Sequence, residues 1–255
     1  MTDNGPVLIL TGASRGLGEA TAYEAARRGL RLVLNARDGT RLAQVAARCR
    51  GMGAATHIVV GDIGQPETAT RLVETARHHF AALHAVVHNA GVLPPIAPVA
   101  QADPAAWEAN WRTNFLGPVM LNAAALPLLR ASRGRIVHVS TGAAVRPVPT
   151  WGAYATAKAA LNHLTRILAR EEPAVTTVAF RPGIVDTAMQ ATIREQGAGV
   201  MPPEEYARFV RYHEEGRLRP PEEIAPLLVA LALHARPEWS GEFIAFDDPR
   251  LQALV

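Results

Sequence analysis

Cysteine and lysine are almost missing from this chain of 255 residues. The single cysteine, Cys49, cannot form a disulfide within the chain, which favours a cytoplasmic protein in a reducing compartment. The chain has 26 basic residues, and all but Lys158 are arginines. Lysine is the cation whose pKa burial can tune, whereas the guanidinium of arginine keeps its charge. Lys158 is therefore a candidate functional residue.

Long apolar runs and clusters of one charge are also absent. No run of 18 apolar residues occurs, and the start MTDNGPVLIL carries neither a basic region nor a small-residue cleavage site. The net charge of +3 is spread along the chain, whereas nucleic-acid binding needs a basic face. The nine histidines lack zinc-site spacings such as H-E-x-x-H. We therefore expect no membrane span, signal peptide, nucleic-acid partner or metal site.

What the chain does have is a regular alternation of short apolar runs with longer segments of helical period. Apolar runs of this kind are typical of parallel strands covered by helices on both faces. The alternation predicts an α/β protein with a doubly wound seven-stranded parallel sheet (Rossmann fold) in a single domain over residues 1–255. Strands are expected at 7–10, 32–34, 58–60, 85–87, 136–139, 177–180 and 243–246, and helices at 16–29, 39–51, 67–80, 104–131, 152–171 and 222–235.

The segment 186–221 departs from this alternation. It contains seven glycines and prolines, with one helix expected at 204–215. It follows the sixth strand at its carboxyl end, where ligands of open sheets bind. We interpret it as a lid over a substrate rather than as a surface excursion.

A glycine-rich stretch follows the first strand and opens the first helix. Its glycines allow close approach of the backbone to a pyrophosphate, and the helix N-terminus offers free N–H groups. A dinucleotide is therefore expected here. The predicted contacts are Gly12, Ser14, Arg15, Gly16, Leu17 and Gly18.

The end of the second strand indicates which dinucleotide binds. Sites that prefer NAD place a carboxylate there for the ribose hydroxyls, but this chain has Asn35-Ala36-Arg37. Arg37 and Arg15 can bracket a 2′-phosphate through charge-assisted hydrogen bonds. The neighbouring carboxylate of Asp38 argues against a 2′-phosphate site. In the alternative interpretation, Arg15 and Arg37 are surface residues without a role in binding. We expect NADP(H).

Tyr154 and Lys158 are four residues apart in a predicted helix, so their side chains share one face. An ammonium beside a phenol lowers the pKa of the phenol towards the working range. The pair predicts that Tyr154 is a general acid or base.

Further motifs are Asp62-Ile63, Asn89-Ala90-Gly91, Asn114-Phe115-Leu116-Gly117, Val139-Ser140-Thr141 and Pro182-Gly183-Ile184-Val185-Asp186-Thr187. Together with the glycine-rich stretch and the Tyr154/Lys158 pair, in this order and at these distances, they resemble the short-chain dehydrogenase/reductase family over essentially the whole chain. The resemblance implies catalytic roles for Tyr154, Lys158 and Asn114, and a homodimer or homotetramer built through the fifth and sixth helices. It also implies cofactor contacts from Asp62, Ile63, Asn89, Ala90, Gly91, Ser140, Tyr154, Lys158, Pro182, Gly183, Val185 and Thr187.

One position departs from the family pattern. The catalytic hydroxyl usually stands thirteen residues before the tyrosine, and this chain has Thr141 there, with Ser140 before it. A threonine hydroxyl can bind a carbonyl oxygen as serine does, although its methyl group narrows the pocket. We expect Thr141 to orient the substrate; the alternative places Ser140 in that role.

The last third of the chain contains Asp186-Thr187-Ala188-Met189-Gln190, Glu215-Gly216-Arg217-Leu218, Pro221-Glu222 and Ser240-Gly241-Glu242-Phe243. These stretches resemble the sepiapterin reductase branch. Ser140-Thr141-Gly142-Ala143-Ala144 and Trp151 resemble the bacterial benzil reductases in particular. The acid that anchors a pterin in that branch is replaced by Ala245, which argues against a pterin substrate. An apolar pocket is expected instead. We expect an NADPH-dependent carbonyl reductase of ketones or diketones; an alcohol dehydrogenase and a non-catalytic dinucleotide sensor are the alternatives. The predicted pocket residues are Val145, Trp151 and Met189, with Met201, Tyr206 and Phe209 from the lid.

Overall fold

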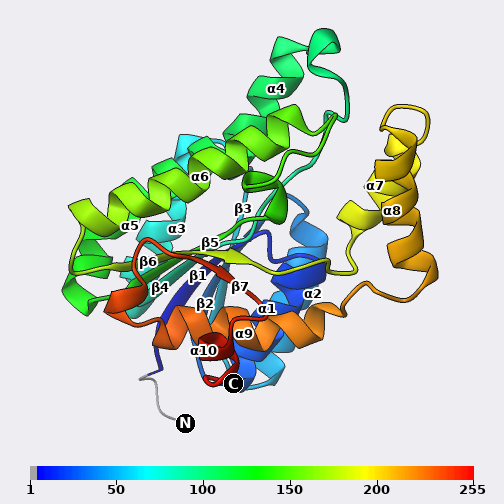
Figure 1. Ribbon diagram of the computed structural model, residues 1–255. Coiled ribbons are helices and arrows are strands. Elements are labelled where there is room, and N and C mark those ends of the chain that lie inside the picture. Colours follow the sequence, from blue (N-terminus) through cyan, green and yellow to red (C-terminus); the bar gives the residue numbers. More distant parts are fainter. Residues whose placement is uncertain (1–4) are drawn as a thin grey trace.

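The computed structural model describes residues 5–255 and has a seven-stranded, all-parallel sheet (Figure 1). The strand order is β3-β2-β1-β4-β5-β6-β7, which confirms the predicted doubly wound α/β fold. The strands are β1 (Val7–Thr11), β2 (Arg31–Ala36), β3 (Thr56–Val60), β4 (Ala85–His88), β5 (Arg135–Val139), β6 (Thr176–Arg181) and β7 (Phe243–Ala245).

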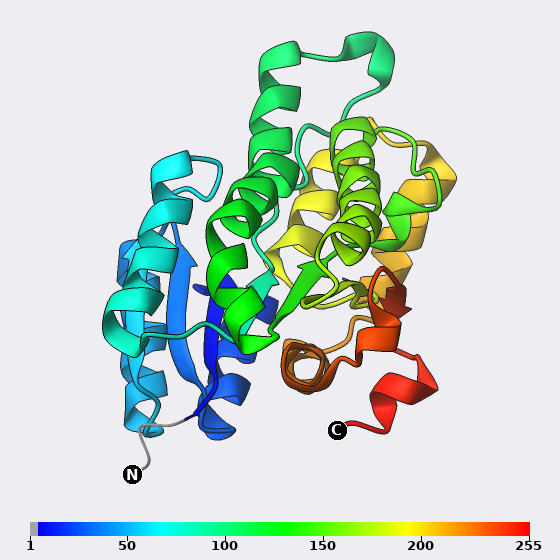
Figure 2. The same ribbon diagram turned by 90° about the vertical axis from the view of Figure 1, so that its left-hand side faces the viewer.

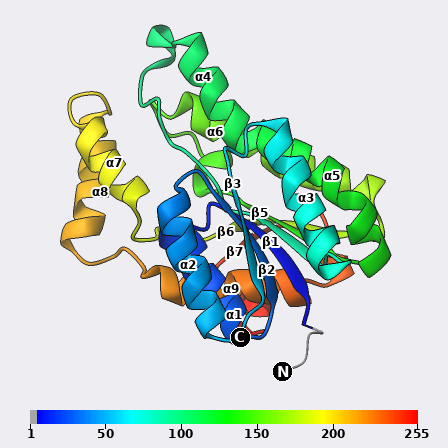
Figure 3. The same cartoon turned by 180° about the vertical axis from the view of Figure 1, so that it is seen from behind.

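Helices cover both faces of this sheet, which explains why the central strands are apolar on both sides. One layer is α1 (Gly16–Arg27), α2 (Gly39–Gly51) and α9 (Pro221–His234), seen from behind in Figure 3. The other layer contains α3 (Pro66–Phe80), α5 (Gly117–Ser132) and α6 (Gly152–Glu171). A short α10 (Pro249–Gln252), which the sequence did not predict, ends the chain.

The helix expected over 104–131 is interrupted. It consists of α4 (Pro104–Trp111), a π-helical turn (Arg112–Leu116) and α5. A π-helical turn adds a residue to the helix and commonly occurs at functional sites. Here it contains the buried Asn114. Figure 2 shows the yellow-green helix α6 running beside α4.

Among the described residues, one helical stretch, Pro104–Ser132, is long and apolar enough to cross a membrane by length and composition alone. Its mean hydropathy is 1.3, and 33% of its most apolar window is buried in this chain. Core helices of soluble proteins pass the same test, and Leu121, Ala125 and Leu129 of this stretch lie in the core. The expected absence of a membrane span therefore stays a prediction.

The segment 186–221 contains two helices rather than one. The predicted helix is α8 (Pro203–Glu214), and α7 (Ala188–Gly197) precedes it. Both stand beside the sheet, at the end of the molecule opposite the termini (Figure 1). Two backbone hydrogen bonds join the two ends of this segment. Asp186 N–H donates to Arg219 O at 2.8 Å, and Arg219 N–H donates to Ile184 O at 2.9 Å.

A chain of buried hydrogen bonds joins the sheet to α5 and α6. His88 of β4 bonds Asn122 Oδ1 at 2.7 Å through Nε2, and Asn122 Nδ2 bonds His138 Nε2 of β5 at 3.0 Å. His138 Nδ1 bonds Thr165 Oγ1 at 2.9 Å, and this hydroxyl donates to Leu161 O. One amide serves both rings, so His88 Nε2 donates, His138 Nε2 accepts and both imidazoles are neutral.

Burial lowers the pKa of His88 to about 4 and that of His138 well below its usual 6.5. The unfolded chain takes up these protons near pH 6.5 and the folded chain only at lower pH. The free energy of unfolding should therefore fall as the pH drops from 6.5 to 4, with about 3 kcal/mol of the loss due to His88.

His88→Gln keeps a donor for Asn122 but cannot titrate in this range. Urea unfolding between pH 4 and 7 should show a shallower acid loss for this variant than for the unsubstituted protein. Equal slopes in the two proteins would contradict the depressed pKa of His88.

Candidate active site

The glycine-rich loop lies at the carboxyl end of β1, and two of its glycines need a left-handed backbone. Gly12 has φ +67° and Gly16 has φ +55°. A Cβ on Gly12 would lie 2.8 Å from Ala90 Cα. Arg15 is the N-cap of α1 and makes no side-chain capping bond. The N–H groups of the first turn are therefore left for an anion, as the predicted pyrophosphate contact requires.

Asn89 and Thr11 join this loop to the end of β4. Asn89 Nδ2 donates to the carbonyls of Thr11 and Gly12, both at 3.1 Å. The Thr11 hydroxyl accepts from the N–H groups of Asn89 and Ala90, also at 3.1 Å. The side chain of Asn89 thus holds the loop in shape, and the predicted cofactor contacts of Asn89, Ala90 and Gly91 stay predictions. Thr11 was not among the predicted site residues.

At the end of β2, both predicted arginines are exposed. Arg37 follows the strand, and Arg15 lies on the neighbouring loop. The Asp38 carboxylate accepts the N–H of Arg41 at 3.0 Å and caps α2. Buried Asn35 donates to the carbonyls of Val59 and Gly61 and so fastens β2 to β3. Asp38 is therefore engaged in the helix cap, and the two guanidinium groups are left exposed to solvent.

Tyr154 and Lys158 lie on α6 over the end of β5, and both are buried. Lys158 Nζ donates to the Val139 carbonyl at 2.8 Å and lies 6.0 Å from the Tyr154 ring centroid. Burial lowers the pKa of Lys158 to about 8. This ammonium has one hydrogen bond to the chain, which leaves it further donors for a ligand.

The sequence predicted a lowered pKa for Tyr154, and this prediction is wrong. Burial raises the pKa of Tyr154 to about 12, and a hydrogen bond with Thr141 opposes part of this rise. Lys158 is turned towards Val139, so desolvation of the phenolate outweighs the attraction of the ammonium. The phenol is consequently protonated and can act as an acid.

Thr141 and Ser140 differ clearly in their surroundings. The Thr141 hydroxyl lies beside Tyr154 and accepts the N–H of Ala143 at 3.2 Å. The Ser140 hydroxyl is buried and has no partner among the described residues. The geometry thus brings Thr141, and not Ser140, to the phenol, as the thirteen-residue spacing predicted.

Asn114 faces the loop after β4 from the π-helical turn. Its Oδ1 accepts the N–H of Val92 at 3.2 Å, and its Nδ2 donates to Val92 O at 2.8 Å. A Cβ on Gly91 would lie 3.1 Å from Asn114 Oδ1 and 3.8 Å from Lys158 Nζ. Asn114 Nδ2 also donates to Asn110 Oδ1 at 2.8 Å. The sequence had missed Asn110, because an asparagine inside a helix carries no distinctive pattern.

An apolar cluster encloses Tyr154 and joins it to the segment 186–221. The ring centroids of Trp151 and Tyr154 are 6.0 Å apart, in an edge-to-face arrangement. The ring centroids of Trp151 and Phe209, which belongs to α8, are 5.1 Å apart. Val145 was predicted to line this pocket, but it is 65% exposed and lies outside the cluster. The cluster consists of Leu93, Ala143, Val148, Trp151, Tyr154, Ile193, Met201 and Phe209, with Ile96, Ala155, Met189, Tyr206 and Tyr212 at its rim.

The other predicted cofactor contacts lie at the same edge of the sheet. Asp62 Oδ1 accepts the N–H of Gly64 after β3, and Ile63 is buried beside α5. After β6, Thr187 lies over the glycine-rich loop, because a Cβ on Gly16 would be 3.1 Å from its methyl group. Their contacts with a cofactor stay predictions, as do those of Ser14, Leu17, Gly18, Pro182, Gly183 and Val185.

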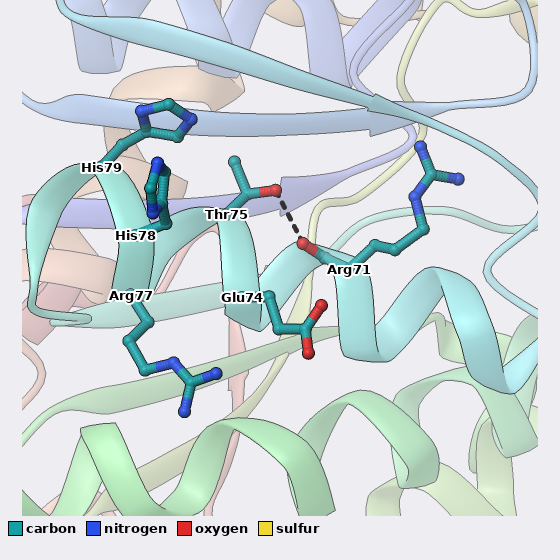
Figure 4. A pocket seen from close by; sticks show the side chains of 6 residues that line it. All are labelled: Arg71, Glu74, Thr75, Arg77, His78 and His79. Atoms are coloured by element: carbon teal, nitrogen blue, oxygen red, sulfur yellow. Dashed lines mark hydrogen bonds between the residues drawn. The ribbon is translucent and has the colours of Figure 1, made fainter.

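A hollow of about 690 Å³ lies elsewhere, along the outer side of α3. α3 starts beside the end of β3 and runs back, so His78 and His79 in its last turn lie at the opposite edge of the sheet. Figure 4 shows that the side chains lining it point in different directions.

No group of three or more His, Cys, Asp or Glu residues suited to a metal ion occurs among residues 5–255.

Comparison with known proteins agrees with this geometry. The pattern of the family described as short chain dehydrogenase matches residues 6–198. The chain belongs to the short-chain dehydrogenase family. A benzil reductase ((S)-benzoin forming) of Saccharomyces cerevisiae is 36% identical over 97% of this chain and 98% of its own. A benzil reductase of Bacillus cereus is 30% identical over 94% and 99%. The crystal structure of a short-chain dehydrogenase/reductase of S. cerevisiae superposes with a TM-score of 0.93, at 34% identity over 98% of this chain and 100% of its own.

Family membership makes the chain an oxidoreductase with an NAD(P) cofactor, so the two hydroxyls can be compared by turnover. Thr141→Ala removes the hydroxyl beside Tyr154 and should lower kcat about a hundredfold, the usual effect of losing one donor to the reacting oxygen. Ser140→Ala removes a hydroxyl without a partner and should change kcat by about threefold at most. The absorbance of the reduced nicotinamide measures both, and a larger loss for Ser140→Ala would reverse the assignment.

Proposed function

We propose that this protein reduces the carbonyl group of ketones or diketones with NADPH, with Tyr154 as the general acid. The observation that supports this proposal is the protonated phenol of Tyr154, which lies beside the Thr141 hydroxyl and is buried in an apolar cluster. A proton donor and a second hydroxyl together suit one carbonyl oxygen. The apolar surroundings exclude water and strengthen both interactions.

Each residue of the site has a separate role in this reaction, which follows from its position. Thr141 orients the carbonyl oxygen towards Tyr154, which donates its proton to that oxygen. Lys158, fixed on Val139, keeps its remaining N–H groups for the nicotinamide ribose. The uncapped start of α1 and the left-handed Gly12 and Gly16 fit a pyrophosphate. When bound, the cofactor supplies the hydride.

The proposed substrate is a small aromatic ketone or diketone. The related proteins of yeast and B. cereus are benzil reductases, and the cluster around Tyr154 is apolar and aromatic. A pterin would need a free acid near Ala245. Of the two acids nearby, Asp247 faces Arg181 at 3.6 Å and Asp248 caps α10, which supports the exclusion of pterins.

Purified protein should consume NADPH when benzil is added, and Tyr154→Phe should lower turnover about a thousandfold, because it removes the general acid. Tyr23→Phe is the matched control, since the Tyr23 hydroxyl bonds Glu19 on α1, away from the site. The loss of NADPH absorbance measures both reactions. Tight NADPH binding without turnover of any carbonyl compound would instead favour the dinucleotide sensor.

The preference for NADPH over NADH is proposed from the exposed Arg15 and Arg37 and from the engagement of Asp38 in the cap of α2. Arg37→Ala should lower the ratio of kcat/KM for NADPH to that for NADH by about tenfold to a hundredfold, the range for charge-assisted hydrogen bonds. Arg27→Ala, at the far end of α1 and paired with Glu24, is the control. Equal efficiency of the unsubstituted protein with both cofactors would contradict the proposal.

We also propose that two copies of the chain associate through the outer faces of α5 and α6. The most apolar window of Pro104–Ser132 is 33% buried in one chain; Leu116, at the end of the π-helical turn before α5, and Ile167 of α6 are both 39% exposed. An apolar face of this kind is typical of an interface. Sedimentation velocity should show a dimer or tetramer that Ile167→Glu dissociates. A monomeric unsubstituted protein would contradict this assignment.

A further inference from the structure

Trp151, the residue before α6, stands between the proposed acid and the lid. Its ring contacts Tyr154 at 6.0 Å with an interplanar angle of 77°, and Phe209 at 5.1 Å with an angle of 31°. The residue is 6% exposed. Trp151 therefore forms a wall of the space in which a substrate meets Tyr154.

The indole N–H of Trp151 is buried and has no acceptor among residues 5–255. A buried donor without a partner costs about 1–3 kcal/mol. The Trp151 ring lies in the apolar cluster, where the Tyr206 hydroxyl donates to Arg194 O at 3.0 Å and the Tyr154 hydroxyl is engaged with Thr141. The part of the chain that the structure describes thus leaves this N–H unpaired, and an oxygen atom of a ligand would remove the cost.

The chemistry of the donor limits what that oxygen belongs to. An indole N–H is uncharged and can only donate, which suits a ketone oxygen. A buried carboxylate would need a cation or several donors. The reacting carbonyl already has Tyr154 and Thr141, so the second acceptor must belong to another group of the same molecule. Trp151 and Tyr154 touch each other, so that group must be close to the reacting carbon.

We infer that the Trp151 indole N–H binds the second carbonyl oxygen of a vicinal diketone and thereby makes the protein prefer diketones to monoketones. This inference rests on the proposed carbonyl reduction and adds the substrate class to it. Trp151 is a specificity-determining residue: its hydrogen bond holds the molecule, while Tyr154 and Thr141 act on the reacting oxygen.

Benzil and deoxybenzoin test this directly, because they share a carbon skeleton and differ by one carbonyl group. Trp151→Phe removes the N–H and should lower the ratio of kcat/KM for benzil to that for deoxybenzoin about tenfold. Trp151→His restores a ring N–H and should recover part of the ratio. Both ketones are assayed on one preparation, so a partly misfolded variant changes both values equally and leaves the ratio intact.

Trp111→Phe is the matched control. The Trp111 N–H is also buried without a partner, but its ring lies against Phe115 outside the apolar cluster. Its removal should leave the ratio unchanged. An unchanged ratio in Trp151→Phe, or an equal fall in both variants, would overturn the inference while carbonyl reduction stands. Absence of activity with either ketone in the unsubstituted protein would overturn the proposed function and the inference together.

Discussion

The hydrogen bond from Lys158 to the Val139 carbonyl is the interaction on which the rest of the site depends. It fixes the start of α6 on the end of β5, at 2.8 Å. Tyr154 stands one helical turn before Lys158, so the same bond sets the position of the phenol relative to Thr141. Moving α6 along the strand would separate the two hydroxyls and expose the ammonium.

Burying that ammonium is costly, and the surroundings of Lys158 do not offset the charge with a carboxylate. Desolvation alone accounts for the lowered pKa of Lys158. The polar groups behind it are the neutral rings of His88 and His138, joined through Asn122. The neutral rings bond the side chains of Asn122 and Thr165 and do not neutralise the charge of Lys158. The ammonium thus keeps its charge and its free donors for a ligand, at some expense of stability.

The strand runs and the spacing of Tyr154 and Lys158 were sufficient to predict the sheet and the centre of the site, because both follow from simple periods. The π-helical turn was not predictable, since the apolar pattern from 104 to 131 continues through it. Helix α7 was obscured by the glycines around it. Val145 lies outside the apolar cluster, so its contact with a substrate stays a prediction. The sign of the Tyr154 pKa shift was wrong because sequence spacing shows a neighbouring charge but not the depth of burial.

The segment 186–221 contributes to the burial of the Tyr154 phenol. Phe209 and Met201 lie in one apolar cluster with Trp151 and Tyr154, and burial in this cluster raises the pKa of Tyr154 to about 12. A substrate must displace part of the cluster, so it has to replace the apolar contacts that it removes. Small polar molecules cannot do so, whereas an aromatic ketone can. The preference for aromatic ketones that we propose would therefore follow from the same packing that buries Tyr154.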